Sequence, residues 1–216
     1  MARDWRTVVD GMTRVQKLVH LAMRLGEDEV ERWRVALLRQ LRDEYVHELE
    51  MMAERVGCKR RAHLGEGPIL AMLNEQASEW AKGIVNTYNY DLAQAIVAIS
   101  KQTPTANRHV YAARLRAWEQ AREKWKLPQI AAYTSGWARA RAQEDFRRYN
   151  GVMGSAELVP KSAVCPVCQA IIARGRIPLR VALNDSPPYH PSCPHRWSIF
   201  ADKITEQECA LLWMGE

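Results

Sequence analysis

Apolar side chains recur at helical spacing through the first part of the chain. One stripe covers residues 5–22, and a longer one runs from Val30 to Val56 and ends at Gly57. A period near 3.6 residues over such lengths predicts amphipathic α-helices. The outward positions of the second stripe alternate in charge, which is typical of a solvated helix face; they include Arg39, Arg42, Asp43 and Glu44.

Prolines and glycines divide the remaining helical sequence. A third stripe begins behind Pro68, and Gly83 favours a kink or break in its middle. A fourth stripe, beginning near Val110, is expected to end before Pro128, because proline removes a helical hydrogen bond and restricts the residue before it. A fifth helix should follow from Pro128 to about Tyr149. Residues 58–67 form a basic, glycine-containing linker and mark a candidate boundary within the helical part of the chain.

The proline content and the periodicity of the sequence change after Gly151. Seven of the ten prolines lie beyond this residue, and helical periodicity returns only at Thr205, where Thr-Glu-Gln-Glu forms a capping box for a short last helix. We therefore expect a mainly α protein in two parts. Residues 1–150 form a long-helix domain, and residues 151–216 form a small α+β module that buries too little apolar surface to fold without a further cross-link.

Composition places the chain among soluble globular proteins. Apolar residues make up 47% and charged residues 26%, and the net charge is +6. No run approaches the roughly 20 apolar residues of a membrane span, and the first residues lack the apolar core of a signal peptide. We expect a cytoplasmic site of synthesis, where clustered cysteines are more often metal ligands than disulfides.

Two matched donor pairs predict a metal site in the module. Cys165-Pro-Val-Cys168 is followed after 21 residues by His190-Pro-Ser-Cys193. Cys-x-x-Cys places two sulfurs on one ion, and the second pair repeats the spacing with one imidazole. Three thiolates and one imidazole form a closed tetrahedral set suited to structural zinc. His195 is the alternative fourth ligand.

The remaining cysteines and the acidic residues complete this interpretation. Cys58 and Cys209 have no partner at ligand spacing and are interpreted as small buried apolar residues. A catalytic zinc site keeps an open position and commonly a carboxylate base, and Asp185 is the only acidic residue between the two halves of the site. We expect a structural site with no catalytic residue, no organic cofactor and no small-molecule substrate.

The segment from Leu127 to Ile199 carries a more specific pattern. It contains Ile130-Ala131, Asn150-Gly151-Val152, Ala163-Val164-Cys165-Pro166-Val167-Cys168 and Arg174-Gly175, and it closes with Pro187-Pro188-Tyr189-His190-Pro191-Ser192-Cys193-Pro194-His195. This order resembles the C-terminal domain of the Mu F-like head morphogenesis proteins, which are minor head proteins of tailed phages. Two positions depart from the family pattern: Thr134-Ser135 stands where Thr-Glu is common, and Pro194-His195 replaces the final Arg-Cys.

The resemblance implies a low-copy virion protein inside the phage head that is made in the host cytoplasm. Its expected partners are the portal protein and the inner capsid surface, and its expected role is in head assembly and DNA passage. The alternative, from another class, is an intracellular zinc-containing protein that binds nucleic acid. A metal-dependent nuclease or hydrolase is the third interpretation.

Basic side chains gather before the module. Residues 108–148 hold ten basic and four acidic residues, interleaved with tryptophans. Such a segment favours contact with packaged DNA or an acidic portal surface, although solvated arginines are common on helices. The candidate contact residues are Arg114, Arg116, Arg122, Lys124, Lys126, Arg139, Arg141, Arg147 and Arg148.

Overall fold

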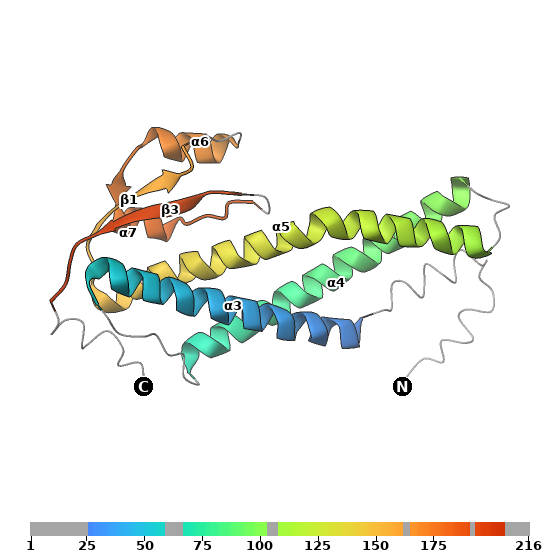
Figure 1. Cartoon of the computed structure of the whole chain (residues 1–216), viewed down its shortest axis with the longest axis horizontal. Helices are drawn as coiled ribbons and strands as arrows, with labels where there is room; N and C mark the ends of the chain where they lie inside the picture. Colours follow the sequence, from blue (N-terminus) through green and yellow to red (C-terminus); the bar gives the residue numbers. More distant parts are fainter. Residues whose placement is uncertain (1–25, 59–66, 103–107, 162–164, 191–192, 206–216) are drawn as a thin grey trace. The chain divides into compact units, whose positions relative to one another are not determined.

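The computed structural model describes residues 26–58, 67–102, 108–161, 165–190 and 193–205. The predicted helices at residues 5–22 and after Thr205 lie outside these ranges. Three long helices come first: α3 (Glu27–Val56), α4 (Pro68–Gln102) and α5 (Arg108–Asn150). A small α+β region follows, so the predicted fold class is confirmed (Figure 1). No helix among the described residues is long and apolar enough to cross a membrane.

The contacts divide the described chain into two compact units. Unit 1 is drawn from residues 1–35 and 76–126, and unit 2 from residues 36–75 and 127–216. Each long helix therefore continues from one unit into the other. The two units are described separately below.

Unit 1 is held by contacts between the later part of α4 and the first part of α5. Arg122 is buried and its Nε donates to Asp91 Oδ2 at 2.9 Å, while its guanidinium lies 5.0 Å from the ring centre of Tyr88. The hydroxyl of Tyr88 donates to Glu119 at 2.6 Å. α4 runs through Gly83 without the predicted break.

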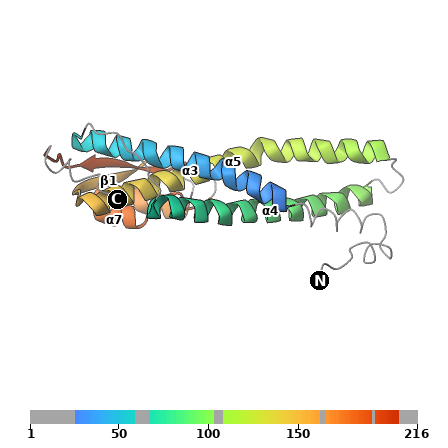
Figure 2. The same ribbon diagram turned by 90° about the horizontal axis from the view of Figure 1, so that it is seen from below.

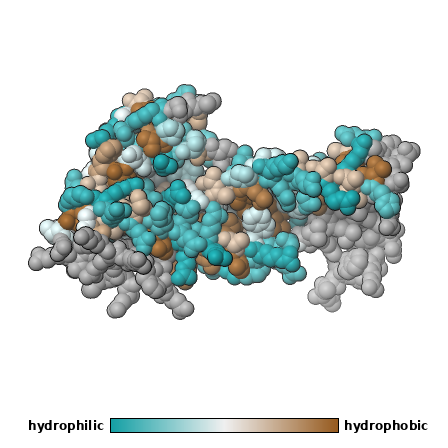
Figure 3. Space-filling view, viewed as in Figure 1, coloured by the Kyte–Doolittle hydropathy of each residue, from teal (hydrophilic) through white to brown (hydrophobic). Residues whose placement is uncertain are grey.

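Unit 2 contains the C-terminal half of α3 and that of α5. The predicted apolar stripe of α3 is confirmed, since six of its members are at most 6% exposed: Leu37, Leu41, Tyr45, Leu49, Met52 and Val56. The outward face of this half of α3 is hydrophilic (Figure 3), and Arg39, Arg42 and Asp43 are exposed as expected.

A ladder of polar contacts sets the register of the two helices in unit 2. Gln40 Nε2 donates to Ser135 Oγ at 2.8 Å, and Arg139 Nε donates to Glu44 Oε2 at 2.7 Å. The next contact runs from Gln143 Nε2 to Glu48 Oε1 at 2.8 Å. The partners are 95 residues apart in every case, so α3 and α5 run parallel here. Glu44, predicted on a solvated face, is instead half-buried in this ladder.

Pro128 does not end a helix, contrary to the prediction. α5 continues through it as one helix of 43 residues. An internal proline removes one helical hydrogen bond and strains the preceding turn. The helix is anchored on both sides, through Arg122 and Glu119 within unit 1 and through Ser135 and Arg139 within unit 2. Tertiary contacts therefore outweigh the local preference.

The module after α5 is a three-stranded antiparallel sheet with two short helices. β1 (Gly154–Val159) lies between β2 (Ile177–Pro178) and β3 (Arg196–Ala201). α6 (Pro166–Ala173) connects β1 to β2, and α7 (Leu179–Asn184) follows β2. Its core contains Ala156, Leu158, Leu179, Ala182, Leu183 and Trp197, each at most 3% exposed. α5 ends at Asn150, where the sequence predicted that the last long helix would stop, and its residues from 127 onward belong to the same unit as the module.

The segment after β3 is tied to the end of α3. Ile204 N donates to Val56 O at 3.1 Å, and Lys203 Nζ donates to Arg55 O at 2.7 Å. Cys58 is buried as predicted, but it is disulfide-bonded and not a free thiol. Cys209 lies outside the described residues.

Candidate metal centre

The first two donors stand at the start of α6. Cys165 occupies the N-cap position with extended backbone (φ −71°, ψ 127°), and Pro166 opens the helix, where its missing N–H costs nothing. Gln169 N donates to Cys165 O at 3.0 Å. This first turn brings the side chain of Cys168, which is fully buried, to the same side as Cys165.

The other donors lie on the segment between α7 and β3. Cys193 N donates to His190 O at 2.9 Å. Cys168 Sγ lies 3.8 Å from Cys193 Sγ, and Cys193 Sγ lies 3.7 Å from His195 Nδ1. The second donor pair therefore lies against the first.

The five donors form two overlapping groups that share Cys168. The ligand atoms of Cys165, Cys168 and His190 all lie within 4.8 Å of one another, and so do those of Cys168, Cys193 and His195. Thiolates bound tetrahedrally at about 2.3 Å from zinc are separated by roughly 3.8 Å. The cluster could hold a metal ion, and all five residues predicted from the sequence take part in it.

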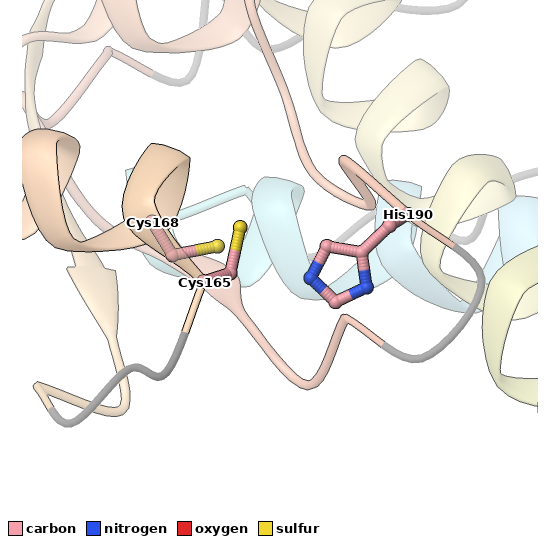
Figure 4. Close-up of side chains that lie close together, drawn as sticks. All are labelled: Cys165, Cys168 and His190. Atoms are coloured by element: carbon pink, nitrogen blue, oxygen red, sulfur yellow. The ribbon is translucent and has the colours of Figure 1, made fainter.

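The two histidines differ in what surrounds their ring nitrogens. His190 Nε2 is buried and has no hydrogen-bond partner among the described residues. Figure 4 shows this nitrogen turned toward the sulfurs of Cys165 and Cys168. His195 is 7% exposed, and its Nδ1 contacts the Cys193 sulfur. A buried imidazole nitrogen without a protein partner is costly unless an ion occupies its lone pair.

The pKa values of the two cysteines in the first pair are shifted in opposite directions, one by the start of the helix and the other by burial. Hydrogen bonding from the backbone of Cys168 lowers the pKa of the Cys165 thiol, as expected at a helix N-terminus. Burial, and then the neighbouring Cys193 side chain, raises the pKa of Cys168 to about 12. Without an ion the Cys168 thiol stays protonated, and a bound metal would displace its proton.

Helix α5 supports the segment that carries His190. A side-chain carbon added at Gly136 would lie 3.3 Å from Cδ of Pro188, which stands two residues before His190. The absence of a side chain at Gly136 therefore allows this segment to pack closely on the helix. Gly136 was not among the predicted site residues; a glycine within a strongly helical segment was the available signal.

Neither donor group contains a carboxylate, within the part of the chain that the structure describes. Asp185 is exposed at the end of α7. The donor set consists of thiolates and imidazoles alone, which suits a closed, tightly held ion.

The candidate contact residues on α5 fall into two classes. Internal ion pairs engage Arg122 with Asp91, Arg139 with Glu44, Arg141 with Asp145, and Arg147 with Glu144. The exposed class holds Arg114, Arg116, Lys124 and Arg148, while Lys126 is partly exposed and lies 5.3 Å from the ring centre of Trp125.

Comparisons of the chain with protein-family models, curated proteins and solved structures gave no match.

Proposed function

We propose that the chain is a structural minor head protein of a tailed phage, with a zinc ion that holds its C-terminal module together. The observation that carries the proposal is the convergence of the Cys-x-x-Cys pair with the closing His-Pro-Ser-Cys-Pro-His segment in one cluster. This is the pairing that the resemblance to the Mu F-like proteins implies.

Zinc is the metal that the donors favour. Thiolate sulfur and imidazole nitrogen prefer zinc to magnesium or calcium, and Cys168 and Cys193 already stand at the separation of tetrahedral ligands. An ion there would tie the start of α6 to the segment leading into β3. A module with such a short core depends on that link.

The ion is proposed as structural, without a catalytic role. Among the described residues the donor cluster offers no carboxylate that could act as a base, and four protein ligands would leave no open position for water. The chain is therefore proposed to act by binding other virion components and not by catalysing a reaction.

The exposed cations on α5 support a contact with a polyanion. Arg114, Arg116 and Lys124 are exposed on the first part of the helix, and the ring of Trp125, next to Lys124 in the chain, is half-exposed. An acidic portal surface or packaged DNA would be attracted to them.

Co-sedimentation with portal oligomers from the same genome tests the proposal. The metal-loaded chain should co-sediment with the oligomers, and a chain with Arg114, Arg116 and Lys124 all changed to glutamate should do so less. DNA binding without portal binding, with affinity falling by orders of magnitude between about 50 and 200 mM salt, would favour the nucleic-acid-binding alternative. Metal-dependent cleavage of DNA would overturn the structural role.

A further inference from the structure

Cys58 carries a covalent bond that the metal centre does not explain. It is disulfide-bonded, whereas the described cysteines of the module, Cys165, Cys168 and Cys193, are free thiols. The chain has five cysteines, so Cys209 is the partner that remains for Cys58. Cys58 belongs to neither of the two donor groups. The chain therefore combines a metal-binding set of thiols with a separate disulfide.

The end of α3 fixes the backbone position of Cys58. Gly57 adopts a left-handed conformation (φ 93°), which glycine accepts without strain. Cys58 N donates to Ala53 O at 2.8 Å, and Gly57 N donates to Glu54 O at 3.0 Å. These two bonds form the Schellman motif that commonly ends a helix. Cys58 is 4% exposed, so its sulfur lies in a buried position that the helix end defines.

The chain returns to this helix end after β3. Ile204 N donates to Val56 O at 3.1 Å, and Lys203 Nζ donates to Arg55 O at 2.7 Å. Figures 1 and 2 show the end of α3 and the segment after β3 side by side, and both belong to unit 2. Val56 stands two residues before Cys58, so Ile204 lies next to the segment that carries the disulfide.

Cys209 is within reach of Cys58 from this anchor. It stands five positions after Ile204, and an extended chain covers up to about 3.5 Å per residue. A disulfide requires its two Cα atoms to approach within about 7 Å. The hydrogen bond between Ile204 and Val56 therefore leaves enough chain for the two thiols to meet.

We propose that Cys58 and Cys209 form a redox-controlled clasp, a disulfide that joins the end of α3 to the segment after β3. The pair stays reduced in the cytoplasm and closes when the chain meets an oxidising environment. The bond closes a loop of about 150 residues, and a cross-link over a long loop lowers the entropy of the unfolded chain. Oxidation therefore locks the module to α3. The inference holds whether or not the chain is a virion component.

Closure is a thiol–disulfide exchange with a small disulfide such as glutathione disulfide. One protein thiolate attacks a sulfur of the reagent, breaks its S–S bond and releases one glutathione. The other protein thiolate then attacks the protein sulfur of the mixed disulfide and releases the second glutathione. Two electrons pass from the protein to the reagent, and the protons of the two protein thiols end on the two glutathione thiols. Zinc at the donor cluster would engage the other three thiolates, which confines the exchange to Cys58 and Cys209.

The test equilibrates the full, zinc-loaded chain with glutathione buffers that range from reduced to oxidised. Remaining thiols are then blocked in denaturant, and the chain is digested with trypsin without a reductant. In the oxidised buffers alone, mass spectrometry should show the peptide of residues 56–59 joined to the peptide that begins at Ile204. The oxidised chain should melt at least about 5 °C above the reduced chain, with an equal zinc content.

Variants separate the clasp from the metal centre. Cys209→Ser should abolish both the joined peptide and the difference in melting temperature, and it should retain its zinc. Cys58→Ala should do the same, and it provides a second variant if the first fails to fold. Absence of the joined peptide in every buffer would overturn the proposal, as would a joined peptide without a change in melting temperature. A bond from Cys58 to a cysteine of the donor cluster, or to Cys58 of a second chain, would also overturn it.

Discussion

The sulfurs of Cys168 and Cys193 lie 3.8 Å apart although 25 residues separate them in the chain. This is the separation expected for two thiolates on one tetrahedral zinc ion. It links the first turn of α6 to the segment before β3, and so connects two parts of the module that are distant in sequence.

Replacing Cys168 by serine should unfold the module at temperatures where the native protein is stable. Structural zinc contributes on the order of 10 kcal/mol to the folding of small modules, and Cys168 belongs to both donor groups. Thermal unfolding with and without a chelator measures the effect. Val167→Ser, at a position that is 51% exposed, is the matched control and should keep its chelator-sensitive transition. An unchanged transition in Cys168→Ser would show that the ion does not stabilise the fold.

The two histidines should respond differently to substitution. His190 Nε2 has no partner in the described protein, so His190→Ala should remove a ligand and reduce zinc affinity by at least about 100-fold. His195→Ala should cost about 10–100-fold, the effect expected of a neighbour that supports the Cys193 ligand. Competition with a chelator gives both affinities. The reverse order would make His195 the fourth ligand.

Gly136 should tolerate alanine but not valine. The added carbon would meet Pro188 at 3.3 Å, and the gain in helix propensity offsets this contact for alanine. Valine adds two methyl groups against the proline and should cost about 1–3 kcal/mol. Urea unfolding measures the change. Gly83→Ala, where nothing lies within 4 Å, should stabilise the chain by about 0.5–1 kcal/mol. If Gly136→Val were as stable as the native chain, the packing of the segment on α5 would not matter.

Tyr45→Phe should destabilise unit 2 by about 2 kcal/mol near neutral pH. The buried hydroxyl donates to Asp145 Oδ2 at 2.8 Å, and its loss leaves a buried carboxylate short of a donor. Urea unfolding of the metal-loaded chain gives the difference, and an unaltered stability at neutral pH would contradict this role of the hydroxyl.

The effect of Tyr45→Phe should also depend on pH. Burial, followed by the charge of Asp145, raises the pKa of Tyr45 above its ordinary value of 10.0. The folded state thus holds the phenol protonated while the unfolded state loses its proton above that value. The stabilising contribution is complete below pH 10 and declines as the pH rises. The difference between the native chain and Tyr45→Phe should therefore shrink in alkali, and a difference that grows there would contradict this sign.

The metal donors could be predicted because their chemistry is local. Cys-x-x-Cys places both sulfurs on one side of a single turn, and the His-Pro-Ser-Cys segment repeats that spacing. The five donors lie on only two short segments, so bringing these segments together is enough to form the cluster. The apolar stripe of α3 was predictable for a similar reason, since a helix with a 3.6-residue period has one face to bury.

Other features depend on partners distant in sequence. Local preference predicted a helix end before Pro128, and only the anchoring of α5 on both sides shows why the helix continues. Gln40, Glu44 and Glu48 stand four residues apart in the sequence, and so do residues 135, 139 and 143, so each set could be placed on one face of its helix. The sequence could not show that these sets face each other.

X-ray absorption at the zinc edge of the purified full chain tests the central claim most directly. A structural centre predicts one zinc per chain with three sulfur neighbours at about 2.3 Å and one nitrogen at about 2.0 Å. A substoichiometric metal content, or a coordination shell dominated by oxygen, would contradict the account.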